Sequence, residues 1–322
     1  MRTGRPALLF LAVLAVILPA CGLAGSPAAT PTPTLTPMPT LTPTPSPSAT
    51  PFGNYGQAMA DVTYCSPDGQ PQKMDIYFPN SGGPWPVFMY VHGGGWNAGD
   101  KAEGAGWKFL NGQGYLVVSV NYRLAAYNVK FPSMIEDVKC AVRYLRAHAG
   151  EYNLEPKRIG ALGASAGGHL VALLGTSDKS AGWDVGEYLD QSSLVQAVVA
   201  EAVFSDFTLT MPNSMQMAIY FAFGEFPGTS SAVNTAASPV TYITPDDPPF
   251  LIIHGEKDGL APVEQAQTLD AKLRAAGVSS KLIIVQNGQH NLASANGEPT
   301  VPSAQEIGQA ILDFLNTNLK SP

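Results

Sequence analysis

The chain has 322 residues, of which 45% are hydrophobic and 13% are charged, and its formal net charge is −7. That apolar content is enough for a full-sized core and argues against a chain that is disordered throughout. The mildly acidic balance lacks the basic footprint of a nucleic-acid-binding protein, so we expect no nucleic-acid partner.

The first 21 residues are typical of an export signal. Arg2 and Arg5 precede an apolar run from Ala7 to Leu18, which is too short to span a bilayer as a helix. The residues that lead up to Cys21 resemble the lipobox of bacterial lipoproteins, in which the cysteine is diacylated and becomes the new N-terminus. This resemblance predicts a lipid anchor at Cys21 on the outer face of the bacterial cell membrane. An ordinary secretory signal, which would release the protein, is the alternative.

Residues 22–52 are rich in Thr and Pro. Such a segment cannot bury a core, and we expect a disordered, extended stalk. The folded domain is therefore expected over 53–322. If Cys21 carries lipid, Cys65 and Cys140 remain as a pair in an oxidising compartment, and we expect them to form a disulfide. Two separate buried thiols are the alternative.

Beyond the stalk, short apolar runs come first and then alternate with amphipathic stretches. The turn residues 66–69 predict a hairpin between the first two strands. Several later runs are continuous, as strands buried on both faces should be. We expect strands over Val62–Cys65, Met74–Phe78, Val87–Val91, Leu116–Val120, Arg158–Leu162, Ala197–Ala202, Phe250–His254 and Lys281–Val285.

Three amphipathic helices are expected between or after these strands. Ser133-x-x-Glu136 and Ser303-x-x-Glu306 each have the pattern of a capping box at a helix start. A third helix is expected over Val263–Ala276, ended by Gly277. This order predicts an α/β fold with a mostly parallel central sheet, an antiparallel N-terminal hairpin and helices on both faces.

The stretch Gly163-Ala-Ser165-Ala-Gly167 lies between a predicted strand and a predicted helix. Glycines allow a sharp strand-to-helix turn that exposes one hydroxyl above the sheet edge, and the helix start directs N–H groups toward negative charge. We therefore predict that Ser165 is a nucleophile. A turn that only packs the helix closely is the alternative.

Three glycines follow His92 directly after a predicted strand. An attacking serine creates a tetrahedral oxyanion, which needs N–H donors about 3 Å away in a dry site. Because glycines let the backbone approach a ligand closely, we predict an oxyanion hole formed by the amides of Gly93, Gly94 and Ala166. His92 would orient this loop. A flexible glycine turn is the alternative.

Five histidines are candidates for the base that activates Ser165. Only His290 lies in a loop between the last predicted strand and the last helix, from which its imidazole can reach the serine. For the acid we choose Asp258, which follows the preceding strand, with Asp206 as the runner-up, because Glu256 lies too close to the strand end. The chain order serine, aspartate, histidine is the one expected for this architecture.

With these residues assigned, the chain resembles an α/β-hydrolase of the hormone-sensitive-lipase-like group, and within it the bacterial feruloyl and acetyl-xylan esterase-like members. The resemblance extends over 61–319. It rests on Met74-Asp-Ile-Tyr-Phe-Pro, His92-Gly-Gly-Gly-Trp, Asn121-Tyr-Arg-Leu, Gly163-Ala-Ser-Ala-Gly-Gly, His254-Gly-x-x-Asp and His290.

The resemblance implies a serine carboxylesterase that cleaves short-chain acyl or feruloyl esters, including esters on polysaccharides, without a cofactor. Two other functions remain as alternatives. The same three side chains also serve a peptidase or an amidase such as a formamidase. A non-catalytic module that binds a surface through a hydrolase fold is the third reading.

The segment Phe204–Phe226 is rich in methionine and aromatic residues. It is interpreted either as a cap that forms a pocket over Ser165 or as a packed surface helix. We expect Trp96, Tyr122 and Phe221 to line the substrate pocket, with simple packing as the alternative for Trp96.

The remaining polar and charged residues are not expected to take part in catalysis. We expect Arg123 and Asp137 to form a structural ion pair beneath the site. The spacing of the remaining His, Cys and carboxylate residues predicts no metal site. No Gly-Lys-Ser/Thr closes a glycine loop, so no Walker-type phosphate loop is expected. The sequence indicates no particular oligomeric state.

Overall fold

The computed structural model describes residues 53–320. The predicted signal segment over 1–21, the lipid site at Cys21 and the stalk over 22–52 lie outside the described residues. Within 53–320, no helix combines the length and the apolar character that crossing a bilayer requires.

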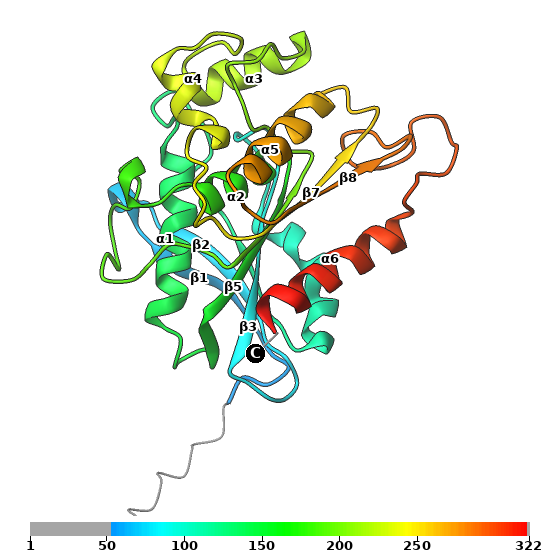
Figure 1. The fold of residues 1–322 in the computed structure, drawn as a ribbon. Helices are drawn as coiled ribbons and strands as arrows, with labels where there is room; N and C mark the ends of the chain where they lie inside the picture. The colour runs from blue at the N-terminus through cyan, green and yellow to red at the C-terminus, as the bar shows by residue number, and fades with distance from the viewer. Residues whose placement is uncertain (1–52, 321–322) are drawn as a thin grey trace, which may run out of the picture. The chain divides into compact units, whose positions relative to one another are not determined.

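One eight-stranded sheet organises the domain, in the order β1-β2-β4-β3-β5-β6-β7-β8 (Figure 1). The pairs β1–β2 and β2–β4 are antiparallel, and the other five pairs are parallel. The strands are β1 (Ala58–Cys65), β2 (Gln72–Tyr77), β3 (Trp85–Val91), β4 (Leu116–Val120), β5 (Leu154–Ala164), β6 (Ala197–Glu201), β7 (Phe250–Gly255) and β8 (Ser280–Val285). Each predicted strand is present, and most differ from the prediction only in their ends.

Helices cover both faces of the sheet. One face packs against α1 (Ser133–Ala147), α2 (Ala166–Thr176) and α5 (Val263–Ala275). The other face packs against the 3-10 helix η2 (Lys101–Gln113) and α6 (Ala304–Leu319). Figure 1 shows α6 and α1 on opposite sides of the sheet. The predicted α/β fold is therefore confirmed.

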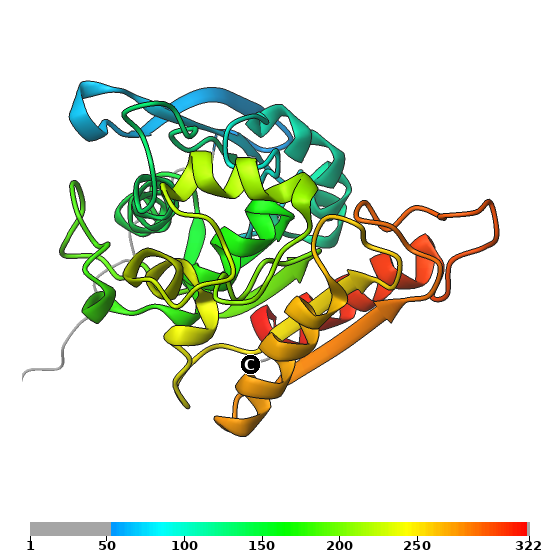
Figure 2. The same ribbon diagram turned by 90° about the horizontal axis from the view of Figure 1, so that it is seen from above.

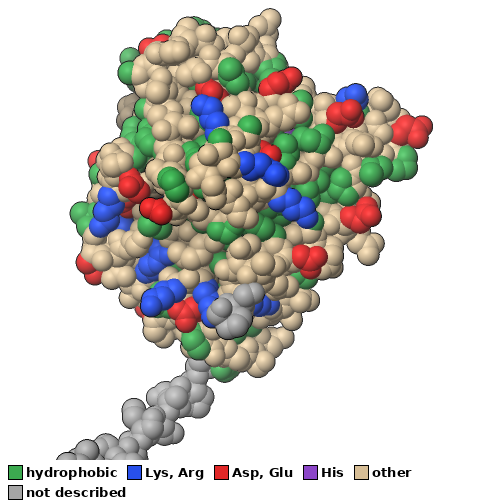
Figure 3. All heavy atoms as spheres, viewed as in Figure 1, with side chains coloured by type: hydrophobic (Ala, Val, Ile, Leu, Met, Phe, Trp, Pro, Cys, Tyr) green, Lys and Arg blue, Asp and Glu red, His purple; other side chains and the backbone are tan. Residues whose placement is uncertain are grey.

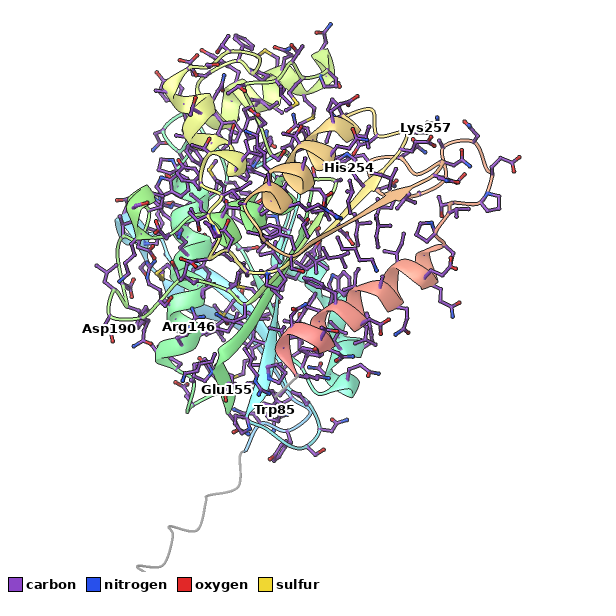
Figure 4. The ribbon with its side chains drawn as sticks, in the orientation of Figure 1. Trp85, Arg146, Glu155, Asp190, His254 and Lys257 are labelled. Carbon is purple, nitrogen blue, oxygen red and sulfur yellow. A yellow bond between two sulfur atoms is a disulfide. The ribbon has the colours of Figure 1, made fainter. Side chains whose placement is uncertain are left out.

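The remaining helices are short. Figures 1 and 2 show α3 (Asn213–Phe223) and α4 (Ala232–Ala237) beyond the carboxyl ends of the parallel strands. In Figure 4, His254 at the end of β7 and Lys257 just after it lie at that same end, whereas Trp85 and Glu155, near the starts of β3 and β5, lie at the opposite end. The 3-10 turns are η1 (Pro67–Gly69), η3 (Lys179–Ala181) and η4 (Pro239–Thr241).

Only one of the two predicted capping boxes forms. At the start of α6, Glu306 N–H donates to Ser303 Oγ at 3.3 Å and Ser303 N–H donates to Glu306 Oε2 at 2.8 Å. At the start of α1 the prediction is wrong, because Ser133 is already the first helical residue and Pro132 occupies the cap. The Glu136 carboxylate instead forms an ion pair with Arg123 at 3.0 Å.

The loop after β4 is held against α1 by the predicted Arg123–Asp137 pair. Arg123 Nε lies 3.0 Å from Asp137 Oδ2, and Asp137 is almost completely buried. The Arg123 backbone N–H donates to the same carboxylate oxygen at 2.7 Å. The pair is therefore structural, as expected.

The disulfide between Cys65 and Cys140 is confirmed. It joins the end of β1 to the middle of α1 across a sequence separation of 75 residues. In the chain-entropy account, closing a loop of that length stabilises the folded state by about 4 kcal/mol. The bridge therefore fixes the antiparallel edge of the sheet to one of the helices that cover its face.

Candidate active site

The centre of the site is the turn between β5 and α2. Ser165 adopts φ 57° and ψ −120°, a backbone conformation that costs about 1–3 kcal/mol for a non-glycine residue. Its N–H donates to Glu201 O at the end of β6 at 2.9 Å. The turn lets α2 begin immediately above β5, with the Ser165 side chain at the carboxyl edge of the sheet.

The turn is possible because the backbone passes very close to its neighbours at two glycines. A Cβ on Gly167 would lie 2.1 Å from Val91 O in β3, and a Cβ on Gly163 would lie 2.4 Å from Gly167 C. Both distances are far below any real Cβ contact. The first turn of α2 therefore contacts the sheet backbone directly, which places Ser165 beside the end of β3.

The structure brings the three predicted side chains together. His290 Nε2 lies 2.8 Å from Ser165 Oγ, and His290 Nδ1 lies 2.8 Å from Asp258 Oδ2. These residues are separated by 125 and 32 positions in the chain, and each follows a different parallel strand. The His290 side chain is 21% exposed, whereas the Asp258 side chain is fully buried.

Four donors surround the Asp258 carboxylate. Besides His290, the N–H groups of Leu260 and Ala261 donate to Oδ1 at 2.8 and 2.9 Å, and His254 Nε2 lies 3.3 Å from Oδ2. Burial by itself would raise the pKa of Asp258, but the hydrogen bonds from His254 and His290 outweigh it and hold the pKa well below its ordinary value. The acid is therefore ionised at neutral pH.

The ionised acid fixes the tautomer of His290. A carboxylate only accepts, so Nδ1 carries the proton and Nε2 presents a lone pair to the Ser165 hydroxyl. That is the arrangement in which an imidazole takes a proton from a serine and gives it to a leaving group.

His254 is a functional neighbour that sequence reasoning missed. It is not the base, yet its Nε2 contacts both Asp258 Oδ2 and, at 2.9 Å, Ala261 O. Among the described residues, its Nδ1 has no hydrogen-bond partner. The i, i+4 spacing of His254 and Asp258 across a turn was the available signal.

The other candidate acids are engaged elsewhere. The Asp206 carboxylate accepts hydrogen bonds from the Thr208 backbone and hydroxyl at 3.0 and 2.6 Å. Glu256 accepts from the Asn287 N–H at 3.2 Å and pairs with Lys257 at 3.6 Å. The geometry thus favours Asp258 over both.

The glycine loop lies against the nucleophile. A Cβ on Gly93 would lie 3.0 Å from Ala164 O and 3.5 Å from Ser165 Cβ, so the bare backbone faces the serine. Gly94 has φ +97°, and a Cβ there would lie 2.3 Å from Ala98 O. Within residues 53–320, no backbone–backbone hydrogen bond outside the helices and strands uses the amide of Gly93 or Gly94, and Ala166 is the first residue of α2, where the amide has no intrahelical acceptor. The three predicted donors therefore remain available for an oxyanion.

His92 and Tyr122 support this loop from inside the protein. Their rings stack with centroids 4.3 Å apart, and Tyr122 Oη donates to His92 O and Gly93 O at 3.1 and 3.2 Å. His92 Nδ1 lies 2.8 Å from Gly93 O. The contacts agree with the expected role of His92 in orienting the loop.

The prediction that Trp96 and Tyr122 line an open substrate pocket is wrong, whereas the prediction for Phe221 stays untested. Trp96 is fully buried and Tyr122 is 2% exposed, so neither side chain is open to a substrate. Trp96 has φ 64°, and this left-handed turn after the glycines directs its ring into the core. Phe221 lies on the outer side of α3, 39% exposed, with Lys130 Nζ 5.3 Å from its ring centroid.

The segment Phe204–Phe226 is divided between core and surface. One set of its side chains is buried, namely Phe204, Phe207, Met211, Met215 and Phe223, and another is exposed, namely Met217, Tyr220, Phe221 and Phe226. Of the buried set, only Met215 and Phe223 lie on α3, whereas the Phe204 ring lies 6.2 Å from the His290 ring. The cavity found beside the base measures about 470 Å³ and is lined by Gly259, Leu260, Gln289, His290 and Asn291.

Metal ligation is not indicated in this part of the molecule. Across residues 53–320, no three His, Cys, Asp or Glu side chains gather in an arrangement that could hold a metal ion. The chemistry that the geometry offers is nucleophilic attack by an activated hydroxyl.

The fold and the serine–histidine–aspartate geometry define an α/β-hydrolase. Residues 74–273, which make up more than half of the chain, match the family model described as BD-FAE. The chain belongs to the BD-FAE family.

Relatives and solved structures agree with this assignment. Esterase LipQ of Mycobacterium tuberculosis is 30% identical over 277 residues, which are 82% of this chain and 63% of LipQ. Esterase LipC of the same organism is 31% identical over 72% of this chain and 58% of its own length. The chain therefore spans about three fifths of these curated relatives.

Two solved structures show the same fold. A truncated carbohydrate esterase from gut microbiota aligns with a TM-score of 0.69 and 26% identity, over 83% of this chain and 98% of that one. The esterase Est2 of the Planctomycetes species Thermogutta terrifontis aligns with a TM-score of 0.67 and 25% identity, over 81% and 92%.

The close approach at Gly167 gives a direct test of the turn. Gly167→Ala would force α2 away from Val91, and we expect the free energy of unfolding to fall by about 2 kcal/mol and kcat to fall about tenfold or more. The matched control is Gly308→Ala in α6, where a Cβ meets nothing within 4 Å and alanine should stabilise the helix by up to about 1 kcal/mol. Equal effects of the two changes in urea unfolding and in kcat would contradict the account.

Proposed function

We propose that this protein is a serine hydrolase that cleaves carboxylic esters through an acyl-enzyme. The observation that carries the proposal is the 2.8 Å contact of His290 Nε2 with Ser165 Oγ, with Asp258 held on the other ring nitrogen. The names of the relatives, LipQ and LipC among them, and of the structural neighbours give independent support.

In the first half of the reaction His290 Nε2 takes the Ser165 hydroxyl proton while Oγ bonds to the ester carbonyl carbon. The carbonyl oxygen becomes an oxyanion that accepts from the amides of Gly93, Gly94 and Ala166. When the intermediate collapses, the C–O bond to the alcohol breaks, and the alcohol leaves with the proton from His290.

In the second half a water molecule replaces the alcohol. His290 removes its proton, the hydroxide oxygen bonds to the acyl carbon, and the second oxyanion collapses to release the acid and return the proton to Ser165. The buried Asp258 carboxylate stabilises the imidazolium that forms at each step. No cofactor enters this cycle.

We propose short acyl or feruloyl esters as substrates, including esters carried by polysaccharides. The cavity lined in part by His290 supports this, because it offers space next to the base. The likeness to a carbohydrate esterase structure also supports it. Figure 3 shows acidic and basic side chains interspersed on one face of the molecule.

Replacing the nucleophile tests the proposal. Ser165→Ala should lower the turnover of p-nitrophenyl acetate by roughly 10⁴-fold or more, because the hydroxyl that forms the acyl-enzyme is lost. The matched control is Ser230→Ala, an exposed serine in the loop after α3, which should leave turnover unchanged.

Three measurements separate the proposed esterase from the competing functions. Retained turnover in Ser165→Ala would refute the nucleophile. An anilide cleaved faster than the matching ester would favour an amidase or peptidase, and a wild-type protein that fails to react with a fluorophosphonate would favour a non-catalytic module.

We further propose that Cys21 is lipidated and that residues 22–52 tether the domain outside the bacterial membrane. Support comes from the basic and apolar residues that precede the cysteine, and from the Cys65–Cys140 disulfide, which suits an oxidising compartment. Secretion is the outcome if this cysteine is not used.

The anchor is tested in a bacterial host by fractionation. Cys21→Ala should move the protein from the membrane fraction to the soluble or secreted fraction and abolish the incorporation of labelled palmitate, because the acceptor thiol is gone. Ser26→Ala should stay with the membrane. A wild-type protein found only in the medium would contradict the anchor.

A further inference from the structure

A chain of hydrogen bonds links the oxyanion loop to the helix that carries the nucleophile. Trp96, directly after the three glycines, donates from its indole Nε1 to His169 Nδ1 at 3.0 Å. His169 lies one turn into α2, where its backbone N–H donates to Ser165 O at 2.9 Å. Its other ring nitrogen, Nε2, lies 2.8 Å from Ala237 O at the end of α4.

The donors and acceptors of these hydrogen bonds have only one consistent assignment. An indole N–H only donates, and a carbonyl oxygen only accepts. His169 therefore carries its proton on Nε2 and offers the lone pair of Nδ1 to Trp96. Burial lowers the pKa of His169 to about 4, so the ring stays neutral and keeps this lone pair at neutral pH.

The Trp96 side chain is held from every direction. Its ring is fully buried, and its centroid lies 5.4, 5.9 and 5.0 Å from the rings of Phe204, Phe207 and Phe223. Its backbone carbonyl accepts from the Ala125 N–H at 2.7 Å. The hydrogen bond to His169 adds one directional contact to this packing.

Two observations connect the hydrogen bond between Trp96 and His169 to the catalytic residues. Trp96 directly follows Gly93, Gly94 and Gly95 and adopts a positive φ of 64°, so a displacement of its backbone also displaces the glycine loop. His169 is fixed to the same helix turn as Ser165. The indole–imidazole bond therefore spans the gap between the predicted oxyanion donors and the nucleophile.

We propose that Trp96 and His169 are positioning residues that set the distance between the amides of the glycine loop and the Ser165 hydroxyl. This inference rests on the proposed serine hydrolase function. Neither side chain touches substrate, and both act through the backbone groups that do.

The test removes the hydrogen bond and keeps an aromatic side chain. Trp96→Phe deletes the indole N–H, and we expect kcat for p-nitrophenyl acetate to fall about tenfold because the oxyanion donors are misplaced. KM should change less than about twofold. The inhibition constant of a trifluoromethyl ketone, which forms a tetrahedral adduct with the serine, should rise by about the same factor by which kcat falls.

Phe207→Leu is the matched control, because it disturbs the same aromatic cluster and leaves the hydrogen bond in place. It should lower the unfolding midpoint as much as Trp96→Phe does, yet leave kcat and the ketone inhibition constant within about twofold of the wild type. If both variants change kcat and the inhibition constant equally, the proposal is overturned and Trp96 only packs.

A second pair of variants covers the case in which Trp96→Phe does not fold. His169→Asn keeps an acceptor near the place of Nδ1, whereas His169→Gln keeps a donor near the place of Nε2. We expect His169→Asn to retain at least about five times the kcat of His169→Gln. Equal values would overturn the proposal.

The failure of this proposal and the failure of the proposed function are distinguishable. Loss of activity in Ser165→Ala together with unchanged activity in Trp96→Phe refutes only the positioning role. An active Ser165→Ala variant refutes the proposed function itself.

Discussion

The site depends on one close contact between backbones. The first turn of α2 lies so near β3 that a single methyl group on Gly167 would overlap Val91 O. This contact, with the positive φ of Ser165, puts the serine at the edge of the sheet and the start of a helix behind it. The strain of about 1–3 kcal/mol at Ser165 is sustained because the surrounding strands are buried and paired on both sides.

Electrostatics then fix the base relative to that serine. The Asp258 side chain has no exposed surface, and leaving a buried carboxylate without partners costs on the order of several kcal/mol. Donors from His254, His290 and the turn after β7 meet that cost. A charge held in this way needs no reorganisation when the imidazolium of His290 forms, which is the condition for efficient acid–base catalysis.

Much of this arrangement could be predicted from the sequence, because it depends on local patterns. Continuous apolar runs identified the strands, and strand–turn–helix context identified Ser165. What failed depended on contacts between distant segments. Trp96 points inward because the glycine loop turns with positive φ, and Tyr122 points inward because its hydroxyl donates to His92 O and Gly93 O; no spacing rule shows either contact. The Ser133 capping box gave way to an ion pair with Arg123, and the contact of Trp96 with His169 joins residues 73 positions apart.

The central claim is that bare backbone amides face an activated serine. A crystal structure of the protein after reaction with diisopropyl fluorophosphate tests it most directly, because the phosphoryl oxygen stands where an oxyanion would. We predict a covalent bond from phosphorus to Ser165 Oγ, with that oxygen about 3 Å from the N–H groups of Gly93, Gly94 and Ala166. An unmodified Ser165, or a phosphoryl oxygen that points to solvent away from these amides, would contradict the claim.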